Sequence, residues 1–450
     1  MTGTTVLSGG GTYVPLPGGR VLTPDGYAVD AETLRRALAS TPANTWRSRE
    51  SRMVAYVAWC RERGRLHTDA GTLADYGAAL AGRRHPAETI AVYTSTVAER
   101  LAAVGTTVPE SERALIRAIV SQRAQEEARD DGGQGDVLQA TECTREDLAA
   151  MLATLDRTTV EGIRDAWVLS LDWYMAGRAS EPASLNLRDV TDETIRLVDP
   201  ETGELVELAA LVITLRLSKT NPYGKTTDTI RIAEQDDSTC PVAAYRAWVA
   251  VLAKHGVTSG PLLRRVKNGR LTTAGRPPKD PTRAGGIGDR TVRNIIASAA
   301  RAAGLTRPLG PEERAVMSTA AERAELAALV LTDAGREALT VRRRLARRAL
   351  RRSLPRYSGH SMRRGKVRED QRGGAPRHVI ERQNRYVPGS NALARYLDDI
   401  VAWDENPTLP ARFRRATPDP VRSRPTARTW MREGFPDGLL VDAGRPVPLS

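Results

Sequence analysis

The stretch YSGHSMRRGK, from Tyr357 to Lys366, holds a histidine and an arginine three residues apart, His360 and Arg363. On a helix, residues at i and i+3 lie on the same face, so the imidazole and the guanidinium would point the same way. A guanidinium matches the oxygens of a phosphate group, and an imidazole exchanges protons near neutral pH. The spacing fits phosphate chemistry, although such a pair also occurs on ordinary basic surfaces.

Two further cations are candidates for the same chemistry. Arg178 follows an apolar helical stretch, GIRDAWVLSLDWYMAG, and Glu181 lies three residues on, where it could hold the guanidinium. Lys219 ends a predicted strand in LSKTNPYGK, where an ammonium group could give a proton to a leaving oxygen. Taken alone, the first pair is equally well a structural ion pair and the lysine a solvated side chain.

A candidate nucleophile follows in RQNRYVPGSNALARYLDD. Tyr396 falls in a helical pattern with Leu393, Leu397 and Ile400. A tyrosine in that pattern is usually a core residue. A phenolic oxygen can nonetheless form a covalent intermediate when it is suitably placed.

The elements that must position these residues are expected to be mainly α-helical, with one small antiparallel sheet. Helix-favouring residues dominate the long periodic segments, and three stretches rich in Ile, Val and Thr (TIRLVDP, ALVITLRLSKT and TDTIRIAE) predict the strands. The predicted organisation is a flexible tail (1–29), a domain of four or five helices (30–130), a Gly-rich linker (131–136), a larger domain (137–407) and a Pro/Arg-rich tail (408–450).

An Arg-rich insertion is predicted within the larger domain, at 305–355. It is expected to be helical, and eight arginines fall between Arg342 and Arg356. The segment is either a solvated basic helix or a set of contacts to DNA phosphates. On the second hypothesis the DNA-binding residues are Arg342, Arg343, Arg344, Arg347, Arg348, Arg351 and Arg352.

The composition favours a polyanionic partner. The formal net charge is +13, and nucleic acid is the commonest partner of so basic a chain. The three cysteines form no CxxC pair, which argues against a disulfide framework and a zinc site. No apolar run approaches the roughly 18 residues of a membrane span, and the first residues do not resemble a signal peptide. We expect a cytoplasmic, nucleoid-associated protein.

The ordered set Arg…Lys…His-x-x-Arg…Tyr resembles the tyrosine recombinase (phage integrase) family, over about residues 40–405. GRASEPASL looks like that family's first arginine box and LSKTNPYGK like its lysine hairpin. GHSMRRG resembles its HxxR box, and RYVPGSNALARYLDD its nucleophile helix. The resemblance implies a core-binding domain at 30–130 and an integrase-like catalytic domain at 137–407.

The resemblance also implies a mechanism without ATP, metal or cofactor. Tyr396 would attack a DNA phosphodiester and form a 3′-phosphotyrosyl link. Arg178 and Arg363 would bind the non-bridging oxygens, and Lys219 would protonate the leaving 5′-oxygen. His360 would assist as acid or base, while Glu181 would orient Arg178.

The sequence departs from the family pattern at three places. The family carries a His or Trp about nine residues before the nucleophile, whereas Tyr386 stands ten residues before Tyr396 here. Tyr386 is therefore included among the candidate catalytic residues, as a hydrogen-bond donor to phosphate. Pro182 follows Glu181 where the family usually has Leu, and the Arg-rich insertion is longer than the usual connection.

The function implied is site-specific DNA recombination, for integration or excision of a mobile element. The implied partner is double-stranded DNA, bound by a homo-tetramer across two sites, with possible accessory DNA-bending factors. Two alternatives remain. One is a DNA-binding relative without catalysis; the other is a related strand-transfer enzyme, for dimer resolution or of the topoisomerase IB or telomere resolvase kind.

Overall fold

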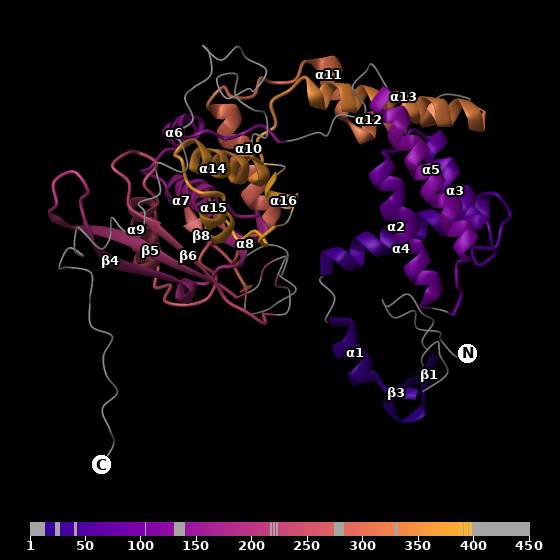
Figure 1. Ribbon diagram of the computed structural model, residues 1–450, viewed down its shortest axis with the longest axis horizontal. Helices are drawn as coiled ribbons and strands as arrows, with labels where there is room; N and C mark the ends of the chain where they lie inside the picture. The colour runs from indigo at the N-terminus through magenta and orange to yellow at the C-terminus, as the bar shows by residue number, and fades with distance from the viewer. Residues whose placement is uncertain are drawn as a thin grey trace, which may run out of the picture. The chain divides into compact units, whose positions relative to one another are not determined.

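The computed structural model describes most of the chain up to residue 397. The described residues are 14–22, 28–39, 43–103, 105–129, 140–216, 218, 221, 224–273, 283–328, 332–389, 391–394 and 396–397. They form a mainly helical protein with small antiparallel sheets, as predicted (Figure 1). The chain divides into two units, 1–390 and 391–450, and each is described by itself.

The N-terminal segment contains a small sheet that was not predicted. Strands β1 (Val14–Leu16), β2 (Arg20–Leu22) and β3 (Ala28–Asp30) pair antiparallel in that order. The turn between β1 and β2 is Pro17–Gly19, where Gly18 and Gly19 have φ of 76° and 73°. Glycine adopts such angles without steric cost, so the Pro-Gly-Gly sequence forms a turn. The prediction of a loose tail is wrong for these strands; residues 1–13 and 23–27 lie outside the described ranges.

Helices α1–α5 occupy the segment in which four or five helices were predicted. Their core contains Tyr56, Trp59, Leu73, Ile90 and Val97. The buried carboxylate of Glu112 accepts the backbone N–H groups of Leu73 and Ala74 at 3.0 and 3.1 Å, and so caps the start of α3. The helices are α1 (Ala31–Ala39), α2 (Ala43–Glu62), α3 (Thr72–Gly82), α4 (Ala87–Ala102) and α5 (Glu110–Arg129).

A second core, which shares no residue with the first, forms around α7 (Val160–Tyr174). Trp167, Leu169 and Leu171 on this helix are fully buried, as its apolar sequence predicted. Among the helices that pack against α7 are α6 (Arg145–Ala153), α9 (Pro241–Lys254), α10 (Asp289–Ala302) and α14 (Gly359–Arg372). Helix α6 begins with a cap at Thr144, whose hydroxyl accepts the N–H of Asp147. The predicted linker 131–136 lies outside the described ranges.

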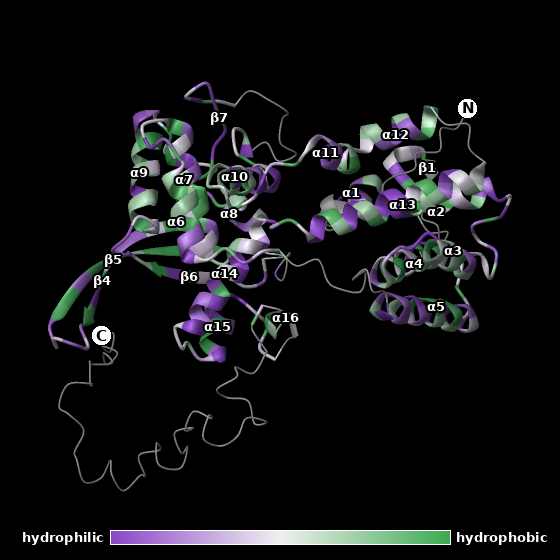
Figure 2. Ribbon diagram, turned by 90° about the horizontal axis from the view of Figure 1, so that it is seen from above, coloured by the Kyte–Doolittle hydropathy of each residue, from purple (hydrophilic) through white to green (hydrophobic). Residues whose placement is uncertain are grey.

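The three predicted strands form one antiparallel sheet against this core. Strands β4 (Val190–Val198), β5 (Leu205–Leu215) and β6 (Asp228–Ala233) pair in sequence order. Alternate residues of β5 and β6, including Ile213 and Ile230, point into the core and are fully buried. Figure 2 shows both hydrophobic and hydrophilic residues along these strands. A further sheet has two strands, β7 (Val266–Lys267) and β8 (Arg270–Leu271). The prediction of a single sheet was therefore incomplete.

The predicted Arg-rich segment is helical. It forms α11 (Pro311–Met317), α12 (Thr319–Ala328) and α13 (Asp333–Arg352). Figure 2 shows hydrophilic residues along α13. The remaining helices are α8 (Ser180–Ser184), α15 (Arg377–Gln383) and, in the second unit, α16 (Asn391–Ala394), with a 3-10 turn at Leu187–Asp189. Across the ranges given above, no helix combines the length and the apolar character needed to pass through a membrane.

Candidate functional site

Arg178 is presented by a tight turn at the end of α7. The helix ends at Tyr174, and Ala176 then adopts a φ of 43°, which is uncommon for a residue with a side chain. Gly177 follows, and a Cβ atom there would lie 3.1 Å from the carboxylate of Asp172. The turn therefore depends on a small residue just before Arg178, whose side chain remains 27% exposed.

Glu181 joins two arginines. Its Oε1 accepts Arg178 Nη1 at 3.0 Å, which is the predicted ion pair. Its Oε2 accepts the backbone N–H of Arg178 at 3.1 Å and Arg385 Nη2 at 2.7 Å. Burial favours the neutral carboxyl, but Arg385 and Arg178 outweigh that effect, so the pKa of Glu181 lies below its usual value. Glu181 is therefore a buried anion that fixes the turn carrying Arg178.

The start of α14 lies directly against this turn. A Cβ on Gly359 would be 3.2 Å from the Cβ of Ala179 and 3.3 Å from its backbone nitrogen. The backbone beside His360 therefore touches the backbone beside Arg178, although 180 positions separate the two boxes in the sequence. His360 is exposed in the first turn of α14. The structure thus brings together the two segments that the sequence predicted to share a site.

Gly365, the glycine after the HxxR box, lies where α14 crosses the chain at Cys143. A Cβ on Gly365 would stand 1.7 Å from the carbonyl oxygen of Cys143. That oxygen accepts the indole N–H of Trp173 at 2.9 Å, and the N–H of Cys143 donates to the Ser361 carbonyl at 3.1 Å. Only glycine fits this crossing, which sets the position of α14 against α7.

Arg363 is buried, in contrast to Arg178. Its side chain is 2% exposed, and its Nη1 and Nη2 donate to the carbonyl oxygens of Ala176 and Asn384 at 2.8 and 2.9 Å. Its Nε donates to the Tyr386 hydroxyl at 2.7 Å, and its guanidinium lies 4.3 Å from the centre of the Tyr386 ring. In this conformation Arg363 ties the Arg178 turn to the segment after α15.

Tyr386 is thereby placed in the cluster, as its position in the sequence suggested. It is 8% exposed and meets Arg363 through both its hydroxyl and its ring. The hydroxyl accepts a hydrogen bond from Arg363, whereas the sequence interpretation made it a donor to phosphate. A hydroxyl that accepts from Arg363 keeps its own O–H for donation, so contact with phosphate depends on whether the phosphate can reach this buried group.

Sequence reasoning missed two residues of this cluster, Arg385 and Asp172. Arg385 has a φ of 57°, and its Nη1 also donates to the Met175 carbonyl at 3.2 Å. Asp172 is fully buried, and neither carboxylate oxygen has a hydrogen-bond partner among the described residues. Burial and the charge of Glu181 raise the pKa of Asp172 well above its usual value, although Arg363 and Arg385 act against the shift. The sequence signal that could have identified Asp172 was an acidic residue inside an apolar helix.

Replacing Asp172 by asparagine is expected to stabilise the protein at neutral pH. Because the pKa of Asp172 is raised on folding, the unfolded chain releases the proton first as the pH rises above about 4. Folding then works against ionisation, and the cost grows until the pH reaches the folded pKa. Asp172→Asn removes this cost. The free energy of unfolding of the variant at pH 7 should therefore be higher than that of the wild type by about 1 kcal/mol.

Urea unfolding from pH 3 to 8 tests this expectation. The advantage of Asp172→Asn should vanish below about pH 4, where the wild-type carboxyl is protonated in both states. A variant less stable than the wild type at pH 7 would contradict it, because the folded protein would then need the carboxylate.

Two predicted residues are not placed relative to this cluster. Lys219 lies outside the described residues. Tyr396 belongs to the second unit, where its N–H donates to the Leu393 carbonyl at 2.8 Å just after α16.

The seven arginines predicted to bind DNA differ in their surroundings. Arg343 and Arg347 pair with Glu325 and Glu322, and Arg344 donates to the Arg83 carbonyl oxygen. Arg342 and Arg351 are exposed, and Arg348 and Arg352 are half-buried. Only part of the predicted set is therefore directed toward solvent.

The described residues contain no group of three or more His, Cys, Asp or Glu side chains arranged to hold a metal ion. What the cluster offers is a partly exposed guanidinium on a rigid turn, beside the positive end of α14 and an exposed imidazole, a combination suited to an anion. No protein-family model and no curated protein matches the sequence.

Proposed function

We propose that the chain is a tyrosine-type site-specific DNA recombinase that cuts and rejoins DNA strands. The observation that carries this proposal is the contact between the Arg178 turn and the start of α14, at Ala179 and Gly359. It brings an arginine held by a buried glutamate next to a His-x-x-Arg helix. Residues 30–130 would form the core-binding domain and 137–407 the catalytic domain.

In the proposed reaction the Tyr396 oxygen attacks a backbone phosphorus and the bond from phosphorus to the 5′-oxygen breaks. Lys219 gives a proton to the leaving 5′-oxygen, and His360 accepts the proton that the attacking Tyr396 hydroxyl loses. Arg178 binds a non-bridging oxygen, because its guanidinium is partly exposed and Glu181 keeps it in place. The reverse attack by a 5′-hydroxyl rejoins the strand, so the link conserves the bond energy.

Arg363 enters this proposal as a residue that changes partners. In the described conformation its three nitrogens donate to Tyr386, Ala176 and Asn384. These three bonds leave two of its five N–H groups, so binding of a DNA phosphate by Arg363 would require its buried guanidinium to become accessible. The first phosphate contact is therefore assigned to Arg178, with Arg363 and Tyr386 joining once DNA is bound.

The burial of Arg363 is also the observation that favours a second candidate, a DNA-binding relative without catalysis. A guanidinium that stayed at 2% exposure could not reach a phosphate. The intact set of Arg178, Lys219, His360 and Tyr396 favours the recombinase. A homo-tetramer on two double-stranded sites and accessory DNA-bending factors belong to the first proposal, for integration, excision or dimer resolution.

Covalent trapping separates the two candidates. Nicked duplexes made from the DNA on either side of the gene are incubated with the protein, then resolved in SDS. The nick lets the short fragment after the cut diffuse away, so a phosphotyrosyl complex accumulates. The recombinase predicts an SDS-resistant band for the wild type and none for Tyr396→Phe.

Tyr386→Phe is the matched control, because it removes a phenolic hydroxyl ten residues away and leaves the proposed nucleophile intact. It should form the band, more slowly than the wild type. DNA binding without any band from the wild type would favour the non-catalytic relative. A band that survives in Tyr396→Phe would show that another residue is the nucleophile.

A further inference from the structure

Helix α13 carries arginines on the face that meets the turn between α3 and α4. Arg344, Arg348 and Arg351 are spaced i, i+4 and i+7, so they form one stripe on the helix. Arg344 donates to the carbonyl oxygen of Arg83, and Arg83 pairs with Glu337 of α13 at 2.8 Å. These contacts hold the stripe against residues 83–86.

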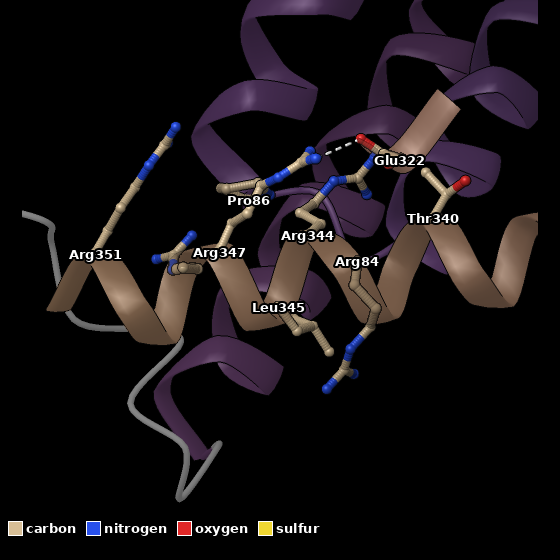
Figure 3. Close-up of a pocket in the computed structure, with 9 residues that line it drawn as sticks. Arg84, Pro86, Glu322, Thr340, Arg344, Leu345, Arg347 and Arg351 are labelled. Carbon is tan, nitrogen blue, oxygen red and sulfur yellow. Dashed lines mark ion pairs between the residues drawn. The ribbon is translucent and has the colours of Figure 1, made fainter. Parts of the chain in front are cut away.

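A cavity of about 420 Å³ lies at this junction (Figure 3). Five arginines line it, together with one carboxylate: Arg84, Arg344, Arg347, Arg348, Arg351 and Glu322. Figure 3 shows Arg344, Arg347 and Arg351 on α13. Arg348 belongs to the same helix, whereas Arg84 lies between α3 and α4. Arginines from two separate parts of the chain therefore surround one space.

The positive charge of this cavity is not balanced by its own lining. Glu322, the carboxylate of the lining, pairs with Arg347 at 2.7 Å, and Arg84 pairs with Glu126, which is not part of the lining, at 3.8 Å. Arg351 is exposed and has no partner among the described residues. Burial and the charge of Arg83 lower the pKa of Arg344, although Glu322 acts against the shift. An anion in the cavity would relieve this repulsion.

Two neighbouring cavities extend the basic surface along α13. One of about 900 Å³ shares Arg344 with the first and adds three arginines and two carboxylates: Arg63, Arg83, Arg336, Glu62 and Glu337. Another of about 720 Å³ shares Arg351 and adds Arg301, Arg314 and Arg356. Helix α13 has 20 residues and is therefore about 30 Å long, which corresponds to roughly nine base pairs of duplex. The cavities thus form a track longer than one small ligand.

We propose that this track binds consecutive backbone phosphates of double-stranded DNA, with Arg84 and Arg351 as two of the contacts. The central cavity suits phosphate and not a base, because none of its lining residues is aromatic. The length of the track along α13 favours a polymer over a free nucleotide. The choice of duplex DNA rests on the proposed function, while the anion site rests on the arginines themselves.

Two double variants test the track. Arg84→Gln with Arg351→Gln removes one cation from each side of the central cavity. Arg290→Gln with Arg323→Gln is the matched control, since both arginines are exposed and neither lines the three cavities. Binding of a random duplex of about 30 base pairs is followed by fluorescence anisotropy between about 50 and about 200 mM salt, where each phosphate contact adds about 0.9 to the slope of log affinity against log salt.

The cavity pair should lower that slope by about 2, so its loss of affinity across the salt range is about tenfold smaller than that of the wild type. The control pair should keep the wild-type slope. Equal slopes for all three proteins, or an equal fall in both pairs, would overturn the inference. So would tight binding of ADP that only the cavity pair abolishes, with the duplex slope unchanged, because the site would then serve a small ligand.

The outcome is independent of covalent trapping. A lowered slope with no covalent complex would leave the track in place and remove the proposed recombinase. A covalent complex with unchanged slopes would remove the track alone. Thermal melts of both pairs check that the proteins remain folded.

Discussion

Gly365→Ala is expected to leave little folded protein. The added Cβ would lie 1.7 Å from the carbonyl oxygen and 2.6 Å from the carbonyl carbon of Cys143. Both are backbone atoms, so no side-chain rotation can relieve the overlap. The backbone at Cys143 is itself held by Trp173 and Ser361. The overlap can be removed only if α14 moves away from α7. We therefore expect a loss of more than about 4 kcal/mol in the free energy of unfolding.

Urea unfolding followed by circular dichroism measures this loss. Gly82→Ala serves as the control, because Gly82 ends α3 and a Cβ there would meet nothing within 4 Å. It should be neutral or stabilise by about 0.4–1 kcal/mol. A Gly365→Ala protein with the wild-type midpoint would mean that α14 does not cross Cys143 as described.

Glu181→Gln should impair both stability and strand cleavage. Glu181 is 2% exposed and holds Arg178 and Arg385 at 3.0 and 2.7 Å. Glutamine keeps the size but leaves two guanidinium groups without their shared anion. Removing one partner of a buried ion pair costs about 3–5 kcal/mol. On the proposed function, misplacement of Arg178 should also slow formation of the covalent complex by about 100-fold.

Glu142→Gln provides the matched control. Glu142 also accepts from two arginines, Arg368 at 2.8 Å and Arg372 at 2.6 Å, but at the opposite end of α14 from His360. It should lose stability to a smaller degree, because Arg372 is 53% exposed. Its rate of covalent complex formation per folded molecule should match the wild type. Equal slowing in both variants would show that the effect of Glu181 is only structural.

The pH dependence gives a second check on Glu181. Its pKa is lowered on folding, so the carboxylate adds stability above its ordinary pKa, and that stability is lost as the pH falls through the folded pKa. The difference in the free energy of unfolding between the wild type and Glu181→Gln should therefore narrow in acid. A difference that stayed constant down to about pH 2 would mean that charge is not the cause.

Local patterns predicted the elements well where the partners are near in sequence. The apolar run before Arg178 forms the buried helix α7, and the three Ile/Val-rich stretches form β4, β5 and β6. The pair of Arg178 and Glu181 followed from its spacing on one helical turn. The N-terminal sheet was missed because its Pro-Gly-Gly turn has the composition of a loose segment, although two positive φ angles make it a specific turn.

Long-range contacts in the site could not be predicted from one sequence. Arg385 reaches Glu181 across 204 positions, and no local period marks such a pair. Asp172 was hidden because an acid in an apolar helix can end at the surface or in the core, and only the fold decides which. The burial of Arg363 depends in the same way on Tyr386 and Asn384, which arrive from beyond α15.

The identity of the residue that becomes joined to DNA decides whether Tyr396 is the nucleophile. Trypsin separates the two candidate tyrosines, because Tyr386 begins the peptide 386–395 and Tyr396 begins the peptide 396–412. The covalent complex is formed on a nicked duplex, digested with trypsin and nuclease, and analysed by mass spectrometry. If Tyr396 is the nucleophile, the peptide 396–412 carries a nucleotide 3′-phosphate, and a strand labelled at its 5′ end stays on the protein. The same mass on 386–395, or retention of the other fragment through a 5′-phosphate, would contradict it.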